Sequence, residues 1–433
     1  MTLHARTVGP SRRKPRPVAP AEAGRGPTLT QPRFMARFTC LGETCPDTCC
    51  TGWTIDVEPA VARRYRAHPD PAWRARLAEA LLDRHEPGRP TRTIVRLDGR
   101  GRCPLLCGDG LCSVHAELGE DWLPGTCRAF PRLEVGDARS RYRTGSIACV
   151  EIARRVLFEP DALEETSEGD PLATIGERRP GERPPTGPLP SVQEAAWIRS
   201  TMLGILARRD LPWSARVALF CVTLQDLGRI DLVRRRGDLV DLLLRTRTVL
   251  ARADVADFDT VFPASHERLV AAFVPILRVL SEAGARDPVI GPTMRALAEP
   301  VWHGLAGEDR TATALATTYA RAARERLEPE LAARPGLPGN LYGALLLQHG
   351  FPTGRPAAAV EAAWRAGFFL AIWKVATVAS MVADGKGFEA AAVEVAYRLG
   401  RALAHWPAAE AFLRADFARR GAFQPAVLAT LLR

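Results

Sequence analysis

The distribution of apolar positions predicts a long helical region in the second half of the chain. After residue 190, apolar residues recur every three or four positions, which is the period of a helix that buries one face. Ser191 and Glu194 have the spacing of a capping box ahead of the apolar Trp197, Met202 and Ile205. This pattern predicts that a helix begins at Ser191.

Apolar positions spaced by three or four predict two further helices. The first has its apolar positions at Leu269, Phe273, Leu277 and Leu280. The second has its apolar positions at Leu315, Tyr319, Ala323 and Leu327. Pro275 would kink the first helix and Pro329 would stop the second, because proline lacks the amide hydrogen and clashes with the preceding turn.

The most apolar stretch, residues 366–383, has Lys374 at its centre and is closed by Arg365 and Asp384. A charge in the middle of a membrane span costs a few kcal/mol, so the stretch is interpreted as a core helix. We therefore expect a cytoplasmic protein that has no membrane partner.

The first half of the chain is organised differently. Residues 31–165 combine short elements with many turn signals, and residues 166–190 are rich in proline and glycine, which is typical of a linker. The predicted fold is mainly α, with a cysteine-rich metal-binding N-terminal domain of short irregular elements (31–165) and a larger all-helical C-terminal domain (191–433).

The positive charge of the chain is concentrated at its N-terminal end. The formal net charge is +10, but most of the excess lies in the first 37 residues, where eight arginines and lysines accompany Glu22 alone. No aromatic residues are interleaved in the way that nucleic-acid modules use them, and no apolar signal segment is present. Residues 1–30 are therefore predicted to form a disordered basic arm, and no nucleic-acid partner is expected.

Cysteine is the residue type that indicates chemistry. Nine of the ten cysteines lie between residues 40 and 149, about a quarter of the chain. In a reducing compartment, dense cysteine favours metal binding over disulfides. The predicted ligands are Cys40, Cys45, Cys49, Cys50, Cys103, Cys112, Cys127 and Cys149.

The spacing favours an iron-sulfur cluster over zinc and leaves both open. Structural zinc is commonly held by C-x2-C pairs, which this chain lacks, whereas cluster ligands often precede proline, as Cys45 and Cys103 do. Two centres, or one centre with spare thiols, are both compatible with eight ligands. Cys107 and the apolar-flanked Cys221 are interpreted as non-ligands, and His115 as a surface or hydrogen-bonded histidine.

The order of these residues resembles the FliB family of flagellin lysine-N-methylases. The matching elements are Pro32 to Cys40, Cys45, Cys49-Cys50, Gly52-Trp53, Cys103-Pro104, Leu111-Cys112, Cys127, Phe130-Pro131-Arg132 and Cys149, with a weaker match at Asn340-Leu341 and Phe351-Pro352. The resemblance implies methyl transfer from S-adenosylmethionine to flagellin lysines, and a 4Fe-4S cluster (or zinc) needed for that activity. It also implies a protein partner, flagellin or another substrate.

The residues themselves identify neither a catalytic base nor a donor site. No G-x-G-x-G follows a predicted strand. The pair Cys45-x3-Cys49 is followed directly by Cys50, so the radical arrangement C-x3-C-x2-C is incomplete. A cationic substrate could meet Trp53 or carboxylates among Asp47, Asp56, Glu120 and Asp121, although a core role for Trp53 and solvated carboxylates are the simpler interpretation. The alternative functions are a non-catalytic metal-chelating or metal-delivery protein and a redox or metal-sensing regulator.

Overall fold

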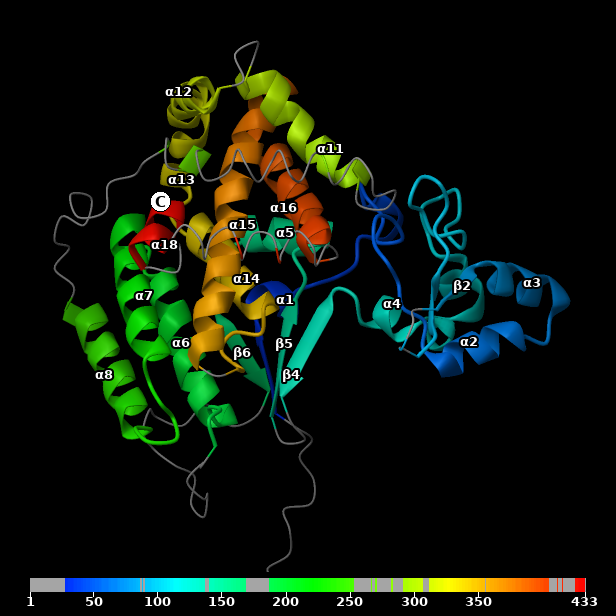
Figure 1. Cartoon of the computed structure of the whole chain (residues 1–433), viewed down its shortest axis with the longest axis horizontal. Coiled ribbons are helices and arrows are strands. Elements are labelled where there is room, and N and C mark those ends of the chain that lie inside the picture. The colour runs from blue at the N-terminus through cyan, green and yellow to red at the C-terminus, as the bar shows by residue number, and fades with distance from the viewer. Residues whose placement is uncertain are drawn as a thin grey trace, which may run out of the picture.

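The computed structural model describes residues 28–85, 88, 90–136, 140–168, 187–252, 266, 269–270, 282, 291–306, 311–354, 356–404, 411, 415 and 425–432. A body of helices occupies most of the molecule, and a small lobe projects from one side of it (Figure 1). The predicted arm up to residue 27, the predicted linker between 169 and 186, and most of the helix predicted over 269–280 lie outside the described residues.

A four-stranded mixed sheet lies beside the helices. Its strands are β1 (Thr28–Pro32), β4 (Arg132–Gly136), β5 (Ser140–Gly145) and β6 (Glu165–Glu168). The order is β4-β5-β1-β6, and β1 pairs parallel with β5 and antiparallel with β6. Paired strands therefore lie at both ends of the predicted cysteine-rich domain. Residues 28–30, which were assigned to the arm, belong to β1, and residues 166–168, which were assigned to the linker, belong to β6.

The helices form one large core. They are α1 (Arg33–Ala36), α5 (Val150–Phe158), α6 (Val192–Ala207), α7 (Trp213–Gly228), α8 (Gly237–Arg252), α11 (Gly291–Pro300), α12 (Ala312–Ala322), α13 (Glu328–Ala333), α14 (Leu337–Gln348), α15 (Pro356–Ala383), α16 (Phe388–Ala404) and α18 (Pro425–Leu432). One buried apolar cluster runs from Phe34 and Met35 of α1 through α5 to Leu432 of α18. The sheet and α5 thus share a core with the helices beyond the linker.

The mainly α prediction is confirmed, and the capping box at Ser191 is present with both of its hydrogen bonds. The stop predicted at Pro329 is wrong. The π-helical turn η5 (Ala323–Leu327) is followed by α13, where Pro329 occupies the first turn. Proline is tolerated there because the first amides of a helix have no partner within it.

The apolar stretch around Lys374 lies in α15. Within the described residues, Ala358–Ala383 is the one helix long and apolar enough to cross a membrane, and 89% of that stretch is buried inside the protein. Lys374 is 3% exposed, and its Nζ donates to the Leu432 carbonyl oxygen at 2.6 Å. Trp213 Nε1 donates to the same oxygen at 2.8 Å. The end of α18 therefore supplies a partner for the buried charge of a core helix.

The projecting lobe has a small core of its own. Its elements are α2 (Pro59–Arg66), α3 (Pro71–Glu79), β2 (Leu81–Arg84), β3 (Arg92–Val95), the 3-10 turns η1 (Gly42–Thr44) and η3 (Glu120–Trp122), the π-helical turn η2 (Val114–Leu118) and α4 (Gly125–Ala129). Trp53, Ile55, Tyr65 and Leu77 are buried in this second cluster, and Cys103 is buried with them. The structure thus divides the predicted cysteine-rich domain between the lobe and the helical body.

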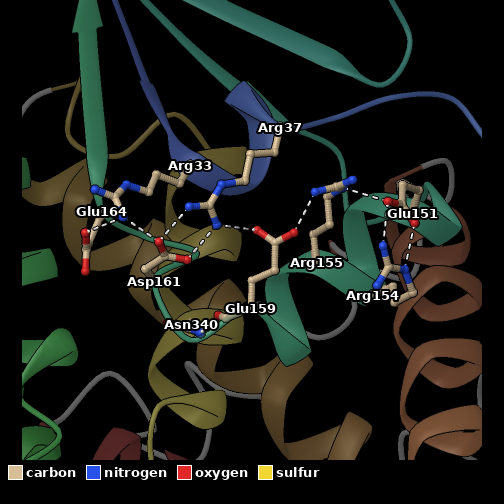
Figure 2. Close-up of polar contacts among 9 residues, drawn as sticks. All are labelled: Arg33, Arg37, Glu151, Arg154, Arg155, Glu159, Asp161, Glu164 and Asn340. Carbon is tan, nitrogen blue, oxygen red and sulfur yellow. Dashed lines mark hydrogen bonds and ion pairs between the residues drawn. The ribbon is translucent and has the colours of Figure 1, made fainter.

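Charged side chains fix α1 against the loop that follows α5 (Figure 2). Arg37 donates to both oxygens of Asp161 at 2.8 Å, and Arg33 reaches the same carboxylate at 2.5 Å. These contacts hold the pKa of Asp161 well below its ordinary value. From the helical body, Asn340 Nδ2 donates to the Glu159 carbonyl oxygen at 2.9 Å. This network anchors the chain directly before Cys40 to the body.

Candidate metal centre

The predicted ligands come from four segments of the chain. Cys40, Cys45, Cys49 and Cys50 lie in the loop that leaves α1, Cys103 and Cys112 flank a turn in the lobe, and Cys127 lies in α4. The Cys103 amide donates to the Cys50 carbonyl oxygen at 2.8 Å, which fixes the first segment against the second. Cys149 is the residue before α5, at the edge of the helical body.

Three thiols are in direct contact. Cys50 hydrogen-bonds with both Cys49 and Cys112, and these bonds lower the pKa of Cys49 to about 7 and that of Cys112 to about 6. The two bonds contribute most to raising the pKa of Cys50 itself. The adjacent Cys49 and Cys50 side chains are therefore hydrogen-bonded to each other.

The other predicted ligands surround this trio. Burial raises the pKa of Cys103 to about 11, and the charges of Cys112 and Cys49 act in the same direction. Burial is also the main cause of the raised pKa of Cys127, with further contributions from Cys103 and Cys112. Each thiol thus lies close enough to others to be affected by their charge.

Cys45 and Cys149 connect the cluster to the body. Burial raises the pKa of Cys149 to about 11, and the charges of Cys45 and Cys49 add to this effect. Burial is also the largest cause of the raised pKa of Cys45, and the charges of Cys40 and Cys49 raise this pKa further. All eight predicted ligands are therefore linked electrostatically, from the exposed Cys40 to the buried Cys103.

The residues interpreted as non-ligands have different surroundings. Cys221 is 2% exposed in the core of the body, and burial alone raises its pKa to about 12. Cys107 lies in a turn, where its amide donates to the Leu111 carbonyl oxygen at 2.8 Å. His115 is exposed on η2, although its charge contributes to the low pKa of Cys112.

The thiols fit a metal centre in chemistry and in convergence. Thiolates are the ligands that iron-sulfur clusters and structural zinc use, and their deprotonation is part of binding. In the described part of the chain, no group of three or more His, Cys, Asp or Glu side chains already has the geometry of a bound metal ion. The thiols are thus neighbours in the fold, without the arrangement of a metal site among the described residues.

The helical body contributes a cation to this cluster. Arg401 of α16 donates from Nη1 to Asp47 Oδ2 at 2.9 Å and from Nε to the Ala148 carbonyl oxygen at 3.1 Å. The hydrogen bond from Cys50 lowers the pKa of Cys49 most, and the positive charge of Arg401 lowers it further. Arg401 was missed from the sequence, because nothing in the local pattern pairs it with a residue 354 positions away.

Of the aromatic and acidic candidates near the cysteines, Trp53, Asp47 and Asp56 have structural partners. Trp53 is 8% exposed in the lobe core and donates from Nε1 to the Cys49 carbonyl oxygen at 2.6 Å, so its core interpretation is confirmed. Asp47 pairs with Arg401, and Asp56 with Arg92. Glu120 and Asp121 are exposed on η3.

Comparison with known proteins identifies the family of this chain. The chain is 33% identical over 136 residues to lysine-N-methylases of Salmonella typhimurium and Salmonella choleraesuis, which covers 31% of this chain and about a third (34%) of theirs. It is 32% identical over 136 residues to the flagellar biosynthetic protein FliU of Salmonella muenchen, and this match covers 80% of FliU. This chain belongs to the FliB family. No family model and no solved structure matches it, so the FliB relationship rests on these relatives.

Proposed function

We propose that this FliB-family protein is a protein lysine N-methylase that uses S-adenosylmethionine and acts on flagellin or another protein. The names of its relatives support the activity, and the single structural observation that supports it best is the proximity of thiols from four segments. Cytoplasmic localisation belongs to the same proposal, because a reducing compartment keeps such thiols available.

The proposed centre is an iron-sulfur cluster, with zinc as the alternative, held by ligands drawn from the eight thiols. Such a centre, when bound, supplies either an open metal site for the donor or a rigid support for the fold. The chain's own residues position it: Arg401 holds the Asp47 loop against the body, and the buried Trp53 holds the Cys49 carbonyl. In the reaction, the neutral lysine amine forms a bond to the methyl carbon, and the sulfonium–methyl bond breaks. Its electron pair leaves with the neutral thioether S-adenosylhomocysteine, and the methylated amine releases its proton to water.

The activity is tested with anaerobically prepared protein, S-adenosylmethionine and flagellin, followed by mass spectrometry of the flagellin lysines. We expect methyl additions that are lost when Cys127→Ser removes a proposed ligand. Cys107→Ser is the matched control, since Cys107 lies in the same lobe outside the thiol cluster, and it should retain activity. Metal-loaded protein that transfers no methyl group would indicate a non-catalytic metal-binding protein instead.

The identity of the metal is tested by elemental analysis and the absorption spectrum of the same preparation. Iron with inorganic sulfide and visible absorption is expected for the proposed cluster. Colourless protein with stoichiometric zinc would overturn the preference for iron and leave the thiol ligands in place.

A further inference from the structure

A cavity of about 280 Å³ lies between α11, α15 and α16, outside the thiol cluster. Its volume is at the lower end of the roughly 300–1,000 Å³ of pockets that bind small molecules. Apolar side chains such as Leu297 and Val395 form part of its wall. In Figure 1, α11 and α16 lie beside the upper part of the long helix α15.

The charged lining of the cavity has both signs. Lys386 Nζ lies 2.7 Å from Glu394 and 3.1 Å from Asp384, and Arg398 Nη2 lies 2.9 Å from the other oxygen of Glu394. Glu299 adds a third carboxylate at the exposed side of the cavity, one turn before His303. Three carboxylates thus face two cations, so these five groups together carry a net negative charge.

This charge pattern matches a small molecule that carries an α-amino-acid group and a further positive charge. A zwitterion can replace the ion pairs that these residues make with one another: Lys386 and Arg398 can bind its carboxylate, and Asp384 and Glu394 can bind its ammonium group. A simple amine such as a lysine side chain would gain nothing from two cations in the wall. The remaining carboxylate, Glu299, suits the additional positive charge of a sulfonium.

The cavity is close to the thiol cluster along two helices. Arg398 precedes Arg401 by three residues on α16, roughly 4.5 Å along the axis, and Arg401 contacts Asp47. The charge of Asp47 also acts on Arg398 itself. On α11, Thr293 lies beside the cysteine loop, because a β-carbon at Gly52 would be 3.8 Å from Thr293 Oγ1. Gly52 has φ +78°, a conformation that favours glycine.

We propose that this cavity binds the methyl donor, S-adenosylmethionine, by its methionyl end. Lys386 and Arg398 receive the carboxylate, Asp384 and Glu394 receive the ammonium group, and Glu299 faces the sulfonium. The proposal rests on the proposed lysine methylase function for the identity of the ligand. It assigns the donor to the seam between α11 and α16, next to the loop that carries Cys49.

The test measures binding of S-adenosylmethionine to the metal-loaded full chain by equilibrium dialysis. Ala296→Phe places a ring into the cavity from α11 without removing a charged contact, and Arg295→Phe places the same ring outside the lining. We expect Ala296→Phe to weaken binding by about tenfold or more and Arg295→Phe to change it by less than about twofold, because only the first ring occupies the ligand's volume. Equal affinities of the two variants would overturn the proposal, as would a wild-type chain that binds no donor.

A second variant tests the role of Glu299 without depending on the cavity's volume. S-adenosylhomocysteine has a neutral sulfur, so Glu299→Gln should weaken binding of S-adenosylmethionine by about tenfold and leave S-adenosylhomocysteine within about twofold. An equal effect on both molecules would refute the assignment of the sulfonium. Circular dichroism and metal content establish that each variant is folded.

The outcomes separate this inference from the proposed function. Donor binding that Ala296→Phe abolishes, without methyl transfer to any protein, would leave the donor site standing and end the methylase proposal. Methyl transfer by Ala296→Phe with an unchanged KM for the donor would support the methylase proposal and refute the donor site.

Discussion

Arg401 connects the helical body to the loop that carries four of the predicted ligands. Its side chain is 7% exposed and that of Asp47 is 26% exposed, so both charges are shielded from water in the pair. Removing one partner of a shielded pair leaves the other without compensation, which costs more than the pair contributes. The single residue therefore controls both the position and the electrostatics of the Cys49 loop.

We predict that Arg401→Gln and Asp47→Asn each lower the free energy of unfolding by about 2–3 kcal/mol. The double variant should cost clearly less than the sum, because it removes both charges together. Urea denaturation of the four proteins measures this. The Arg92–Asp56 pair is the control, since both side chains are about half exposed and its coupling should stay below ~1 kcal/mol. Additive losses for the Arg401 pair would contradict the prediction.

His349, at the end of α14, gives the body a dependence on pH. Burial, with the nearby Arg365, lowers the pKa of His349 from 6.5 to about 4. Above pH 6.5 the ring is neutral in both states and contributes nothing. Between pH 6.5 and 4 the unfolded chain binds more protons than the folded chain, so stability falls as the pH falls.

We predict that this residue removes about 2 kcal/mol of stability between pH 7 and pH 4.5. Denaturation curves across this range should show a shallower decline in His349→Asn than in the wild type. His85→Asn is the control, because His85 is exposed on the lobe. Identical pH profiles for the wild type and His349→Asn would show that the buried ring is not responsible.

At the scale of elements, the sequence predicted the features that depend on residues close together in the chain. The capping box at Ser191 began a helix where it was expected, because the hydroxyl and the carboxylate satisfy amides within four residues. Pro329 was misread as a stop, because a proline that ends a helix and a proline in the first turn of a new one look alike in sequence. The strands β1 and β6 were missed, since their partners lie more than 100 residues away.

In the candidate site, too, the local features were predictable and the contacts between distant segments were not. The thiols were predictable because cysteine in a reducing compartment is rare enough for clustering to be informative. Arg401 and the cavity between α11 and α16 were not predictable, because they depend on how distant helices pack. The same holds for Lys374, whose partner Leu432 only becomes a neighbour in the folded body.

The capping box of α6 provides a prediction at this scale. Ser191→Ala removes the side-chain acceptor for the Glu194 amide, which lies at 3.1 Å, and should destabilise the body by about 1 kcal/mol. Thr317→Ala, on an exposed face of α12, should change stability by less than ~0.5 kcal/mol. Thermal unfolding of the two variants makes the comparison, and a Ser191→Ala protein as stable as Thr317→Ala would exclude a contribution from the cap.

At the scale of the whole molecule, two cores of unequal size share one chain. The body has a large continuous apolar cluster, whereas the lobe cluster is small and is bordered by Cys50, Cys103, Cys112 and Cys127. Small domains rarely bury enough apolar surface to be stable alone and often depend on a metal. We therefore infer that the proposed centre stabilises the lobe far more than the body.

Removal of metal by a chelator should consequently open the lobe and leave the body folded. Hydrogen exchange followed by mass spectrometry should show lost protection of the amides of α2, α3 and the β2–β3 pair, by about a hundredfold or more, while α14, α15 and α16 stay protected. Cys127→Ser should reproduce this pattern in the untreated protein, and Cys107→Ser should not. Loss of protection throughout the chain would mean that the two clusters unfold as one unit. An unchanged lobe would mean that its small core is sufficient without metal, and that the thiols are gathered for chemistry alone.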